Sequence, residues 1–455
     1  MDRAPANGEP APPPPAPPPG RCHFWLPSKR RHCANSPLPS TQYCGNHPPE
    51  PSSSASRRRV PCPVDPSHTV FEDNLEAHVG KCPFRKHADA LAAQPYYSKA
   101  INSGGGGGAV TSAAKRASVH NLSEQQFRGL LAKIRSAHAS VAIQMRDSHI
   151  TPLACDKWMK GQVDRTVPYQ EKHVVQQVSI VGNMETFGML PSGREGAEDE
   201  AADNALAVVE FGAGRGYLTQ MLADCYGIKN IFLVERRSYK LKADRSLRQN
   251  EGVTLERLRI DIEDLNLHGV QTLIGSQYLA IGKHLCGPAT DMTIMCCLHE
   301  QHNYTEEKGH DKCRLQGLAL ATCCHHLCQW KHYANKAFLS GLGIAEEEFH
   351  AMTLFSSWAV DGDHSSQDSL EAEDSSSEVR DREAKKPDLE FTGIERIIRG
   401  MPGEERNALG FMCKDIIDSG RLLWLRSKGL DADLVSYVPS NISPENHLLI
   451  AKCRS

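Results

Sequence analysis

Residues 208–218 have the sequence Val-Val-Glu-Phe-Gly-Ala-Gly-Arg-Gly-Tyr-Leu. The apolar run that ends at Glu210 and Phe211 is typical of a buried strand, and the residues after the turn favour a helix. Three glycines, Gly212, Gly214 and Gly216, let the backbone turn sharply and approach a ligand closely. This order of strand, glycine-rich turn and helix predicts a ligand site at the start of an α/β domain.

A carboxylate stands at the end of the next apolar run. Glu235 follows Gly216 by 19 residues, and this spacing places it to accept hydrogen bonds from ribose hydroxyls. A dinucleotide site has the longer Gly-x-Gly-x-x-Gly pattern, whereas the tighter spacing here, preceded by Glu210, favours a ligand without pyrophosphate. S-adenosylmethionine fits that description. We expect it to contact Glu210, Gly212, Gly214, Gly216, Glu235 and Asp261, the last of them placed to reach the adenine amine.

Short β-rich runs alternate with helical segments from about residue 150 onward. The runs lie at residues 206–211, 230–235, 277–281, 318–322 and 447–451. This alternation predicts a mainly parallel, doubly wound sheet, so we expect a Rossmann-like domain over residues 149–455. Residues 191–204 and the acidic stretch 361–387 are polar and rich in Ser or Gly, and we interpret both as solvated insertions.

A first cluster of possible metal ligands precedes this domain. It consists of Cys22, Cys33, Cys44 and His47. The closing Cys-x-x-His places two ligands on one tight turn, and four such ligands make a closed structural zinc site. His23 and His32 are rival ligands. Aromatic and basic residues between the ligands suit base stacking and phosphate contact, namely Phe24, Trp25, Lys29 and Arg30.

A second cluster follows the Ser/Arg-rich stretch 51–59. It consists of Cys62, His68, His78 and Cys82. The last two are four residues apart and share one face of a helix, with Phe71 and Leu75 available as a small core. Segments of about 25 residues cannot supply a stable core alone, so zinc binding is expected to provide most of their folding free energy.

The 455 residues exceed what one hydrophobic core usually supports. We predict a disordered Pro-rich head at 1–20, a CCCH finger at 21–49, a CHHC finger at 60–87, and a linker with a helix at 88–148. The glycine run 103–108 is interpreted as a flexible joint. Ser123 and Gln126 form a capping-box pattern before an apolar stripe that begins at Phe127. We expect that helix to pack on the catalytic domain, the alternative being a free RNA-guiding or coiled-coil arm.

Composition limits the class of protein. The sequence has no run of eighteen apolar residues and no secretory signal, so we expect an intracellular protein, nuclear or cytoplasmic, without a membrane partner. Its 16 cysteines are then better explained by metal ligation or free thiols than by disulfides. The net charge of −3 conceals a basic segment around residues 29–31 and 57–59 and an acidic one at 361–383.

Two further segments fall at strand ends, where open α/β sheets bind ligands. Residues 281–287 read Ile-Gly-Lys-His-Leu-Cys-Gly, and residues 321–328 read Ala-Thr-Cys-Cys-His-His-Leu-Cys. Methyl transfer to a hydroxyl needs an aligned oxygen and a proton acceptor, for which Lys283, His284 and His325 are the candidates. Lys172 with Glu445 is an alternative. The second segment also allows a third zinc site, although adjacent ligands do not easily wrap one ion.

These motifs together identify a resemblance. The order of a CCCH finger, a CHHC finger, Val-Glu-Phe-Gly-Ala-Gly-Arg-Gly, Gly-Lys-His-Leu-Cys-Gly and Cys-Cys-His-His is similar to that of the eukaryotic tRNA ribose methyltransferases that modify the fourth nucleotide of the acceptor stem. Residues 94–99, Lys172-His173, Gln176-Gln177 and 443–446 extend the resemblance over nearly the whole chain from Cys22. The chain departs from the family pattern at Ala321-Thr322, where a proline-containing pair is expected, and in the acidic insertion.

The resemblance implies 2′-O-methylation of the tRNA acceptor stem with S-adenosylmethionine, and two structural Zn²⁺ ions. No DNA partner is expected, and the oligomeric state stays open. Two rival functions remain: an RNA-binding scaffold with a decayed methyltransferase fold, and methylation of a protein or small molecule. Intact Gly212, Gly214, Gly216 and Glu235 argue against the first, and the two fingers with their basic surroundings argue against the second.

Overall fold

The computed structural model describes residues 17, 19–26, 31–37, 41–44, 47, 58–65, 68–105, 107–141, 145–163, 170–190, 206–237, 242–249, 252–298, 313–361 and 393–454. The chain divides into two units, Met1–Ala88 and Asp89–Ser455. Most of the predicted head, the insertion at 191–204, and nearly all of the acidic insertion at 361–387 lie outside the described residues. Each unit is described below by itself.

The first unit consists of short elements. They are β1 (Trp25–Leu26), β2 (Arg31–His32), β3 (Arg59–Pro61), β4 (Thr69–Phe71), η2 (Glu72–Asn74), α1 (Leu75–Lys81) and the start of α2 (Pro83–Ala92). β1 pairs with β2 and β3 with β4, both antiparallel. Among the described residues of this unit, the buried hydrophobic side chains are all cysteines: Cys22, Cys33, Cys44, Cys62 and Cys82. An apolar core therefore cannot account for its folding.

The second unit is built on one eight-stranded sheet, with the strand order β5-β11-β12-β10-β9-β6-β7-β8. Its strands are β5 (Arg146–Asp147), β6 (Leu206–Phe211), β7 (Asn230–Val234), β8 (Thr254–Leu258), β9 (Gln277–Cys286), β10 (Arg314–Cys323), β11 (Leu430–Ser436) and β12 (His447–Cys453). Only β12 runs antiparallel to its neighbours, β10 and β11. The predicted mainly parallel sheet is therefore confirmed, with β5 and β11 as strands that the sequence pattern did not indicate.

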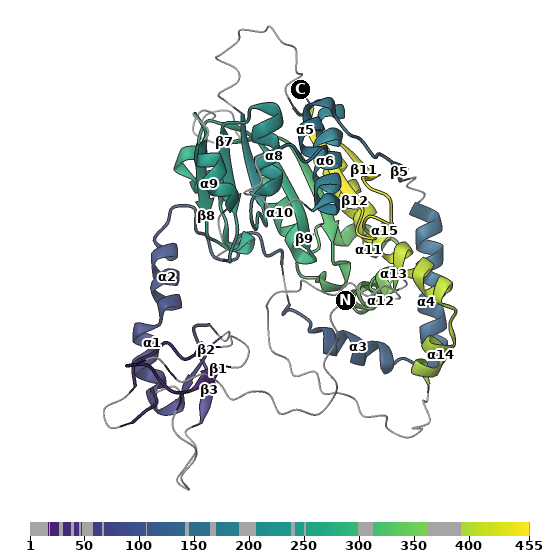
Figure 1. Ribbon diagram of the computed structural model, residues 1–455. Coiled ribbons are helices and arrows are strands. Elements are labelled where there is room, and N and C mark those ends of the chain that lie inside the picture. The colour runs from purple at the N-terminus through teal and green to yellow at the C-terminus, as the bar shows by residue number, and fades with distance from the viewer. Residues whose placement is uncertain are drawn as a thin grey trace, which may run out of the picture. The chain divides into compact units, whose positions relative to one another are not determined.

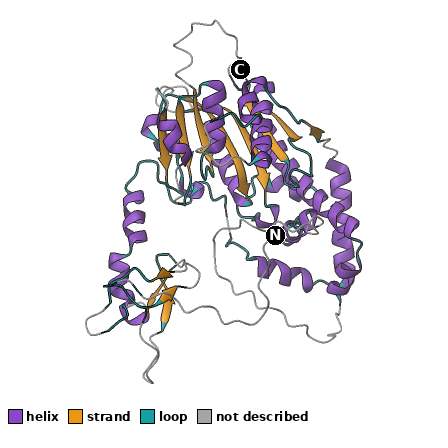
Figure 2. Cartoon of the chain, in the orientation of Figure 1, coloured by secondary structure: helices purple, strands orange, loops and turns teal. Residues whose placement is uncertain are grey.

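Helices cover both faces of this sheet (Figures 1 and 2). One face packs on α5 (Asp156–Met159), α6 (Glu171–Thr186), α8 (Tyr217–Tyr226) and α9 (Lys242–Gln249). The other packs on α10 (Pro288–Leu298) and α15 (Gly403–Ser427). Neighbouring residues of β6, such as Val208 and Val209, belong to opposite cores, as the two-residue period of a strand requires. The strand order reverses direction between β6 and β9, and ligands of such folds bind at that point, beyond the carboxyl ends of the strands.

A third core forms among helices beside the sheet. They are α3 (Ser112–His120), α4 (Glu124–Val141), α11 (Lys336–Gly341), α12 (Glu346–Phe355), α13 (Trp358–Asp361) and α14 (Ile394–Gly400). α4 begins with the predicted capping box: the Gln126 backbone N–H donates to Ser123 Oγ at 3.2 Å, and the Ser123 N–H donates to Gln126 Oε1 at 2.8 Å. The α4 stripe packs with residues of α12 and α15, so the prediction that this helix packs on the catalytic domain is confirmed.

The linker before α3 packs against the rest of the second unit. The Asn102 side chain is buried and donates hydrogen bonds of 2.7 Å to the carbonyls of Ile262 and Leu265. Gly104 has φ +72°, and a Cβ at this position would lie 2.2 Å from the carbonyl oxygen of Lys331. The interpretation of this glycine run as a flexible joint is therefore wrong at Gly104, where glycine permits a close backbone approach.

The helix α15 carries polar side chains into the interior. Lys414, Asp418 and Arg421 are all buried on one helix of 25 residues.

Across the ranges that the structure describes, no helix combines the length and apolar character needed to cross a membrane.

Candidate active site and metal centres

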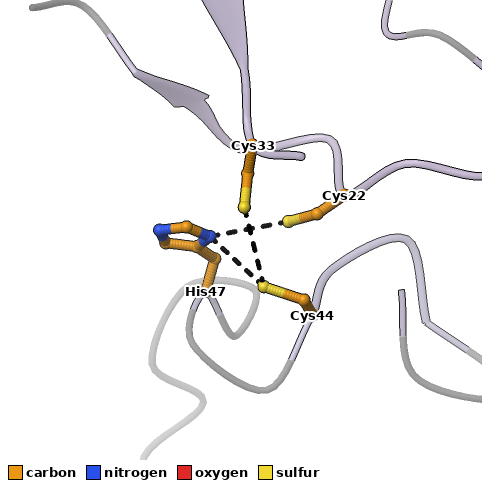
Figure 3. A group of neighbouring side chains, drawn as sticks. All are labelled: Cys22, Cys33, Cys44 and His47. Carbon is orange, nitrogen blue, oxygen red and sulfur yellow. Dashed lines mark hydrogen bonds between the residues drawn. The ribbon is translucent and has the colours of Figure 1, made fainter. Parts of the chain in front are cut away.

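The first predicted set of metal ligands converges in space (Figure 3). His47 Nδ1 lies 3.6 Å from Cys22 Sγ and 3.4 Å from Cys44 Sγ, and the sulfurs of Cys33 and Cys44 are 4.0 Å apart. The rival ligand His32 instead turns its Nδ1 to the carbonyl oxygen of His23, at 3.0 Å. Three thiols and one imidazole around a common point have the donor set and spacing that a structural zinc ion requires.

The second predicted set also converges. The sulfurs of Cys62 and Cys82 are 3.9 Å apart, and Cys82 Sγ lies 3.7 Å from His68 Nε2. The ring of His78 joins them, with its Nε2 at 3.0 Å from that of His68. The hairpin of β3 and β4 brings Cys62 and His68 together, and α1 with its C-cap residue brings His78 and Cys82 together. The donor set fits a second structural zinc ion.

The glycine loop after β6 has the backbone conformation that its sequence predicts. Gly212, Gly214 and Gly216 have φ of +60°, +51° and +78°, values that L-residues with a side chain rarely adopt. Gly216 is the N-cap of α8, which begins at Tyr217, and a Cβ on Gly212 would come 3.2 Å from the Leu285 side chain. The loop therefore turns the chain from strand to helix within five residues.

Glu210 lies beneath this loop. Its Oε2 accepts hydrogen bonds from the backbone N–H of Thr219, at 3.2 Å, and from the Thr219 hydroxyl. Burial raises the pKa of Glu210 to about 7, against the opposing effect of the Thr219 hydrogen bonds. The carboxyl group thus anchors the first turn of α8, and it is not among the residues that line the adjoining cavity.

A cavity of about 550 Å³ opens at the carboxyl ends of the strands. It has the size of a small-molecule site. Three residues from the predicted donor site line it, Gly212, Glu235 and Asp261, together with others such as Cys286 and His332. Gly212, Glu235 and Asp261 follow β6, β7 and β8, Cys286 ends β9, and His332 lies after β10, so the sheet topology brings them together.

Two of the carboxylates that line the cavity, Glu235 and Asp261, are already held in place. Glu235 accepts backbone N–H groups of Gly214 at 3.1 Å and of Arg237 at 2.9 Å, one on each oxygen. Asp261 caps the short helix η4 (Ile262–Asp264) and forms an ion pair of 3.3 Å with Arg236. A carboxylate oxygen has two lone pairs, so each oxygen of Glu235 keeps one for a ligand hydroxyl.

Arg257 on β8 supports the glycine loop, and sequence reasoning missed it. Its guanidinium donates to the carbonyl of Gly214 at 3.1 Å and to both oxygens of Asp244 at 2.6 and 3.0 Å. The signal available in the sequence was a single arginine in the strand Thr-Leu-Glu-Arg-Leu, which is too weak to assign a partner.

Lys283 is buried near the end of β9. Its Nζ lies 3.2 Å from His173 Nδ1, at the start of α6. Burial and, to a smaller extent, the charge of Lys172 lower the pKa of Lys283, whereas Glu210 and Cys323 raise it, and the net pKa is about 8. The side chain of His284 lies outside the described part of the chain. Among the predicted proton acceptors, Lys283 is therefore a candidate whose pKa lies close to neutral pH.

His325 lies in a buried charged network. Its Nε2 is 2.8 Å from Asp418 Oδ2 and its Nδ1 is 3.5 Å from Glu445 Oε2. Burial opposes the charge on the ring, but Asp418 and Glu445 outweigh it and raise the pKa of His325. A histidine held in its protonated form is a poor acceptor for a further proton.

The network continues through residues that sequence reasoning missed. Asp418 Oδ2 also accepts from Thr322 and faces His447 Nδ1, both at 2.8 Å, while Arg421 bridges Asp418 at 2.7 Å and Asp291 at 2.5 Å. The sequence signal was present: Asp418 and Arg421 are three residues apart on one face of an amphipathic helix. Their partners lie on β10, β12 and α10, which no local pattern connects.

The structure separates the residues of the third zinc site considered above. Cys323 and Cys324 lie with Cys286 of β9. His325 joins Asp418, and Cys328 accepts a contact of 3.3 Å from Arg421. The alternative of one ion held within residues 323–328 is therefore wrong, because the chain directs these side chains to different partners.

Comparison with known proteins identifies two zinc fingers followed by a methyltransferase, as the sequence predicts. The family model described as "Methyltransferase TRM13" matches residues 175–452. The model of a CCCH zinc finger in TRM13 protein matches residues 20–48, and that of a U11-48K-like CHHC zinc finger matches residues 59–83. These ranges contain the glycine loop and all eight predicted finger ligands.

Curated relatives resemble the chain over its length. A protein of Oryza sativa subsp. japonica named "tRNA:m(4)X modification enzyme TRM13" is 70% identical over 53% of this chain and 99% of its own. Proteins of Mus musculus and Homo sapiens named as its homologs are 31% and 30% identical, over 95% of this chain and 94% of theirs. With the catalytic model covering more than half of its residues, the chain belongs to the TRM13 methyltransferase family.

Proposed function

We propose that this protein transfers a methyl group from S-adenosylmethionine to a ribose 2′-hydroxyl at position 4 of the tRNA acceptor stem. The observation that carries the proposal is the cavity at the carboxyl ends of β6 to β9, lined by Gly212 of the glycine loop and the fixed carboxylates Glu235 and Asp261. The printed name of the relatives, a tRNA:m(4)X modification enzyme, supports the substrate.

The donor-binding residues have separate roles in this proposal. The positive-φ glycines keep side chains away from the donor, and Glu235 accepts hydrogen bonds from its ribose hydroxyls. Asp261, held by Arg236, faces the adenine. Glu210 acts indirectly, since it fixes the turn from loop to α8. When bound, the donor supplies a methyl carbon that its sulfonium already activates.

The protein must then align the hydroxyl oxygen and accept its proton. We assign the proton to Lys283 Nζ, because burial lowers the pKa of this amine to about 8, so that roughly a tenth of it is uncharged at pH 7 and this fraction rises with pH. Glu235 and Gly212 would hold the donor, which would supply the methyl group to the hydroxyl oxygen and become a neutral thioether. His325 and Glu445, both in the buried network, keep the neighbouring strand ends in place.

The fingers are proposed to bind the RNA, each with a structural Zn²⁺. In each of them one phenylalanine stacks on a ligand histidine and stays partly exposed: Phe24 lies 4.0 Å from the His47 ring, and Phe84 lies 5.1 Å from the His68 ring. Exposed aromatic rings stack on unpaired bases, and nearby arginines such as Arg58 attract phosphates.

The test combines donor binding with product mapping. Gly214→Asp introduces a side chain at φ +51° and a second carboxylate beside Glu235, so we expect donor affinity by calorimetry to fall at least about 100-fold, or about 2.7 kcal/mol. Gly275→Asp is the matched control, because it places the same residue at φ +77° in the loop that precedes β9.

Mass spectrometry of tRNA fragments locates the product. We expect one methyl group on the ribose of nucleotide 4 after incubation with the full-length protein and donor. A methyl group on a base, or on protein, would contradict the proposed substrate. Tight donor binding without any methylation of RNA would favour the scaffold function instead.

A further inference from the structure

Three cysteines meet at the carboxyl ends of two neighbouring strands, outside both fingers. Cys286 ends β9 and Cys323 ends β10, and the two are register partners in the parallel pair. Their sulfurs are 3.4 Å apart, and Cys324 brings a third sulfur so that all three lie within 4.8 Å of one another. All three are free thiols.

The backbone explains how adjacent cysteines reach a common point. Cys324 has φ +50°, and among the non-glycine residues that the structure describes it shares a positive φ only with Ala100. This conformation reverses the chain after Cys323, so the two side chains need not point to opposite sides as they would in a continuing strand. The next loop is held close, since the Gly287 N–H donates to the carbonyl of Cys323 at 3.0 Å.

The fingers provide an internal standard for this spacing. Two sulfurs that are each about 2.3 Å from a tetrahedral zinc ion lie about 3.8 Å apart. The finger pairs Cys33–Cys44 and Cys62–Cys82 are 4.0 and 3.9 Å apart. The Cys286–Cys323 pair differs from the tetrahedral spacing by a few tenths of an ångström, which side-chain rotation accommodates.

We propose that Cys286, Cys323 and Cys324 bind a third Zn²⁺ ion as thiolates, each releasing its proton on binding. Within the described residues the group contains no fourth protein ligand, so the fourth position is left to water or another small ligand. Cys286 lines the donor cavity, and the ion therefore closes the cavity wall where β9 and β10 end. Three protein ligands with one open position distinguish this site from the closed sites of the fingers.

A buried carboxylate lies beside the three thiols. Glu445 Oε2 is 3.2 Å from Lys414 Nζ and 3.5 Å from His325 Nδ1. Glu445 is also close enough for its charge to act on the thiols of both Cys286 and Cys324. Such a carboxylate suits the outer shell of a metal site, where it accepts a hydrogen bond from a bound water.

Among the described residues of the second unit, the neighbouring group of His325, Asp418 and His447 is the other cluster with metal-ligand spacing. Its carboxylate is already engaged by Arg421 at 2.7 Å and by Thr322 at 2.8 Å. A cation there would have to displace a buried guanidinium. The thiol group has no such competing cation in the described contacts, and soft sulfur ligands are the ones that zinc prefers.

Zinc content of the full-length protein tests the proposal. After purification under reducing conditions, addition of zinc and removal of the excess, elemental analysis is expected to give three ions per chain. Cys286→Ser and Cys324→Gly are each expected to give two, and glycine suits the positive φ of position 324. Cys225→Ser, which removes a half-buried thiol on α8, is the matched control and should keep three.

A second set of variants tests whether misfolding is the cause of any loss of zinc. A chain with both Cys22→Ser and Cys62→Ser should keep one ion, and adding Cys286→Ser should remove it while circular dichroism stays unchanged. Two ions in the wild-type chain, or three in Cys324→Gly, would overturn the proposal, as would a Cys286–Cys323 disulfide mapped in protein that holds two ions. The measurement needs neither donor nor RNA, so its result is independent of the proposed methyl transfer.

Discussion

The two units reach a folded state by different means. In the first unit the buried hydrophobic side chains of the described residues are five cysteines, all predicted metal ligands. In the second unit two apolar clusters fill the space between the sheet and its helices, and a third lies among helices beside the sheet. Metal ligation can thus take the place of an apolar core in short segments, whereas a catalytic domain of this size stabilises itself by burial.

The largest expected effect is on a finger. Cys62→Ser removes one zinc ligand, and the apparent binding free energy of structural zinc in such peptides is about 10–16 kcal/mol. We expect residues 68–82 to lose protection in hydrogen exchange, while peptides of β6 and β9 keep theirs. Unchanged protection of α1 in this variant would show that the finger has another source of stability.

The second unit carries the proposed methyl transfer. Lys283→Met is expected to lower kcat by about 10²- to 10⁴-fold, the usual contribution of a positioned proton acceptor. Because burial lowers the pKa of Lys283 to about 8, its amine is protonated below that pH, and the wild-type kcat should rise from pH 7 to 9. The profile should become flat in Lys283→Met.

Removal of the Lys172 charge serves as the matched test of that assignment. This charge lowers the pKa of Lys283, so Lys172→Met should move the pH profile to higher values without flattening it. A wild-type kcat that does not change through pH 8 would exclude Lys283 as the proton acceptor.

A smaller loss of stability is expected in the buried network. Asp418→Asn removes a charge that Arg421 and His325 face without solvent, and breaking one partner of such a pair typically costs about 3–5 kcal/mol. Urea unfolding of the second unit measures it. Asp415→Asn, on the same helix but partly exposed in its pairs with His138 and, at 3.6 Å, with His447, should cost below about 1 kcal/mol. Equal losses in the two variants would show that the loss of stability does not depend on burial of the network.

The smallest effect tests the helix α4. Ser123→Ala removes the hydroxyl that caps it and is expected to cost about 1 kcal/mol in the same unfolding experiment. Ser140→Ala is the control near the other end of the helix, since its hydroxyl donates only to the carbonyl of Ala137. A loss as large at Ser140 would contradict the capping role.

Local patterns predicted the parts of the site that lie close together in the sequence. The glycine loop, the carboxylate of Glu235 and the capping box at Ser123 are all where the residues indicate. The prediction for the glycine run failed at Gly104, because a local pattern cannot show that the backbone of Lys331 lies against it. Glu210 was expected to contact the donor, and the structure instead shows its partner to be Thr219.

The sequence alone determined the two finger ligand sets and the strand-turn-helix at residues 208–218, because in each case neighbouring residues carry all the needed chemistry. Only the tertiary structure decided which distant groups meet: Cys286 with Cys323, Lys283 with His173, and Asp418 with His325. The register of parallel strands and the packing of α15 set those pairs, and both depend on long-range contacts that no local spacing encodes.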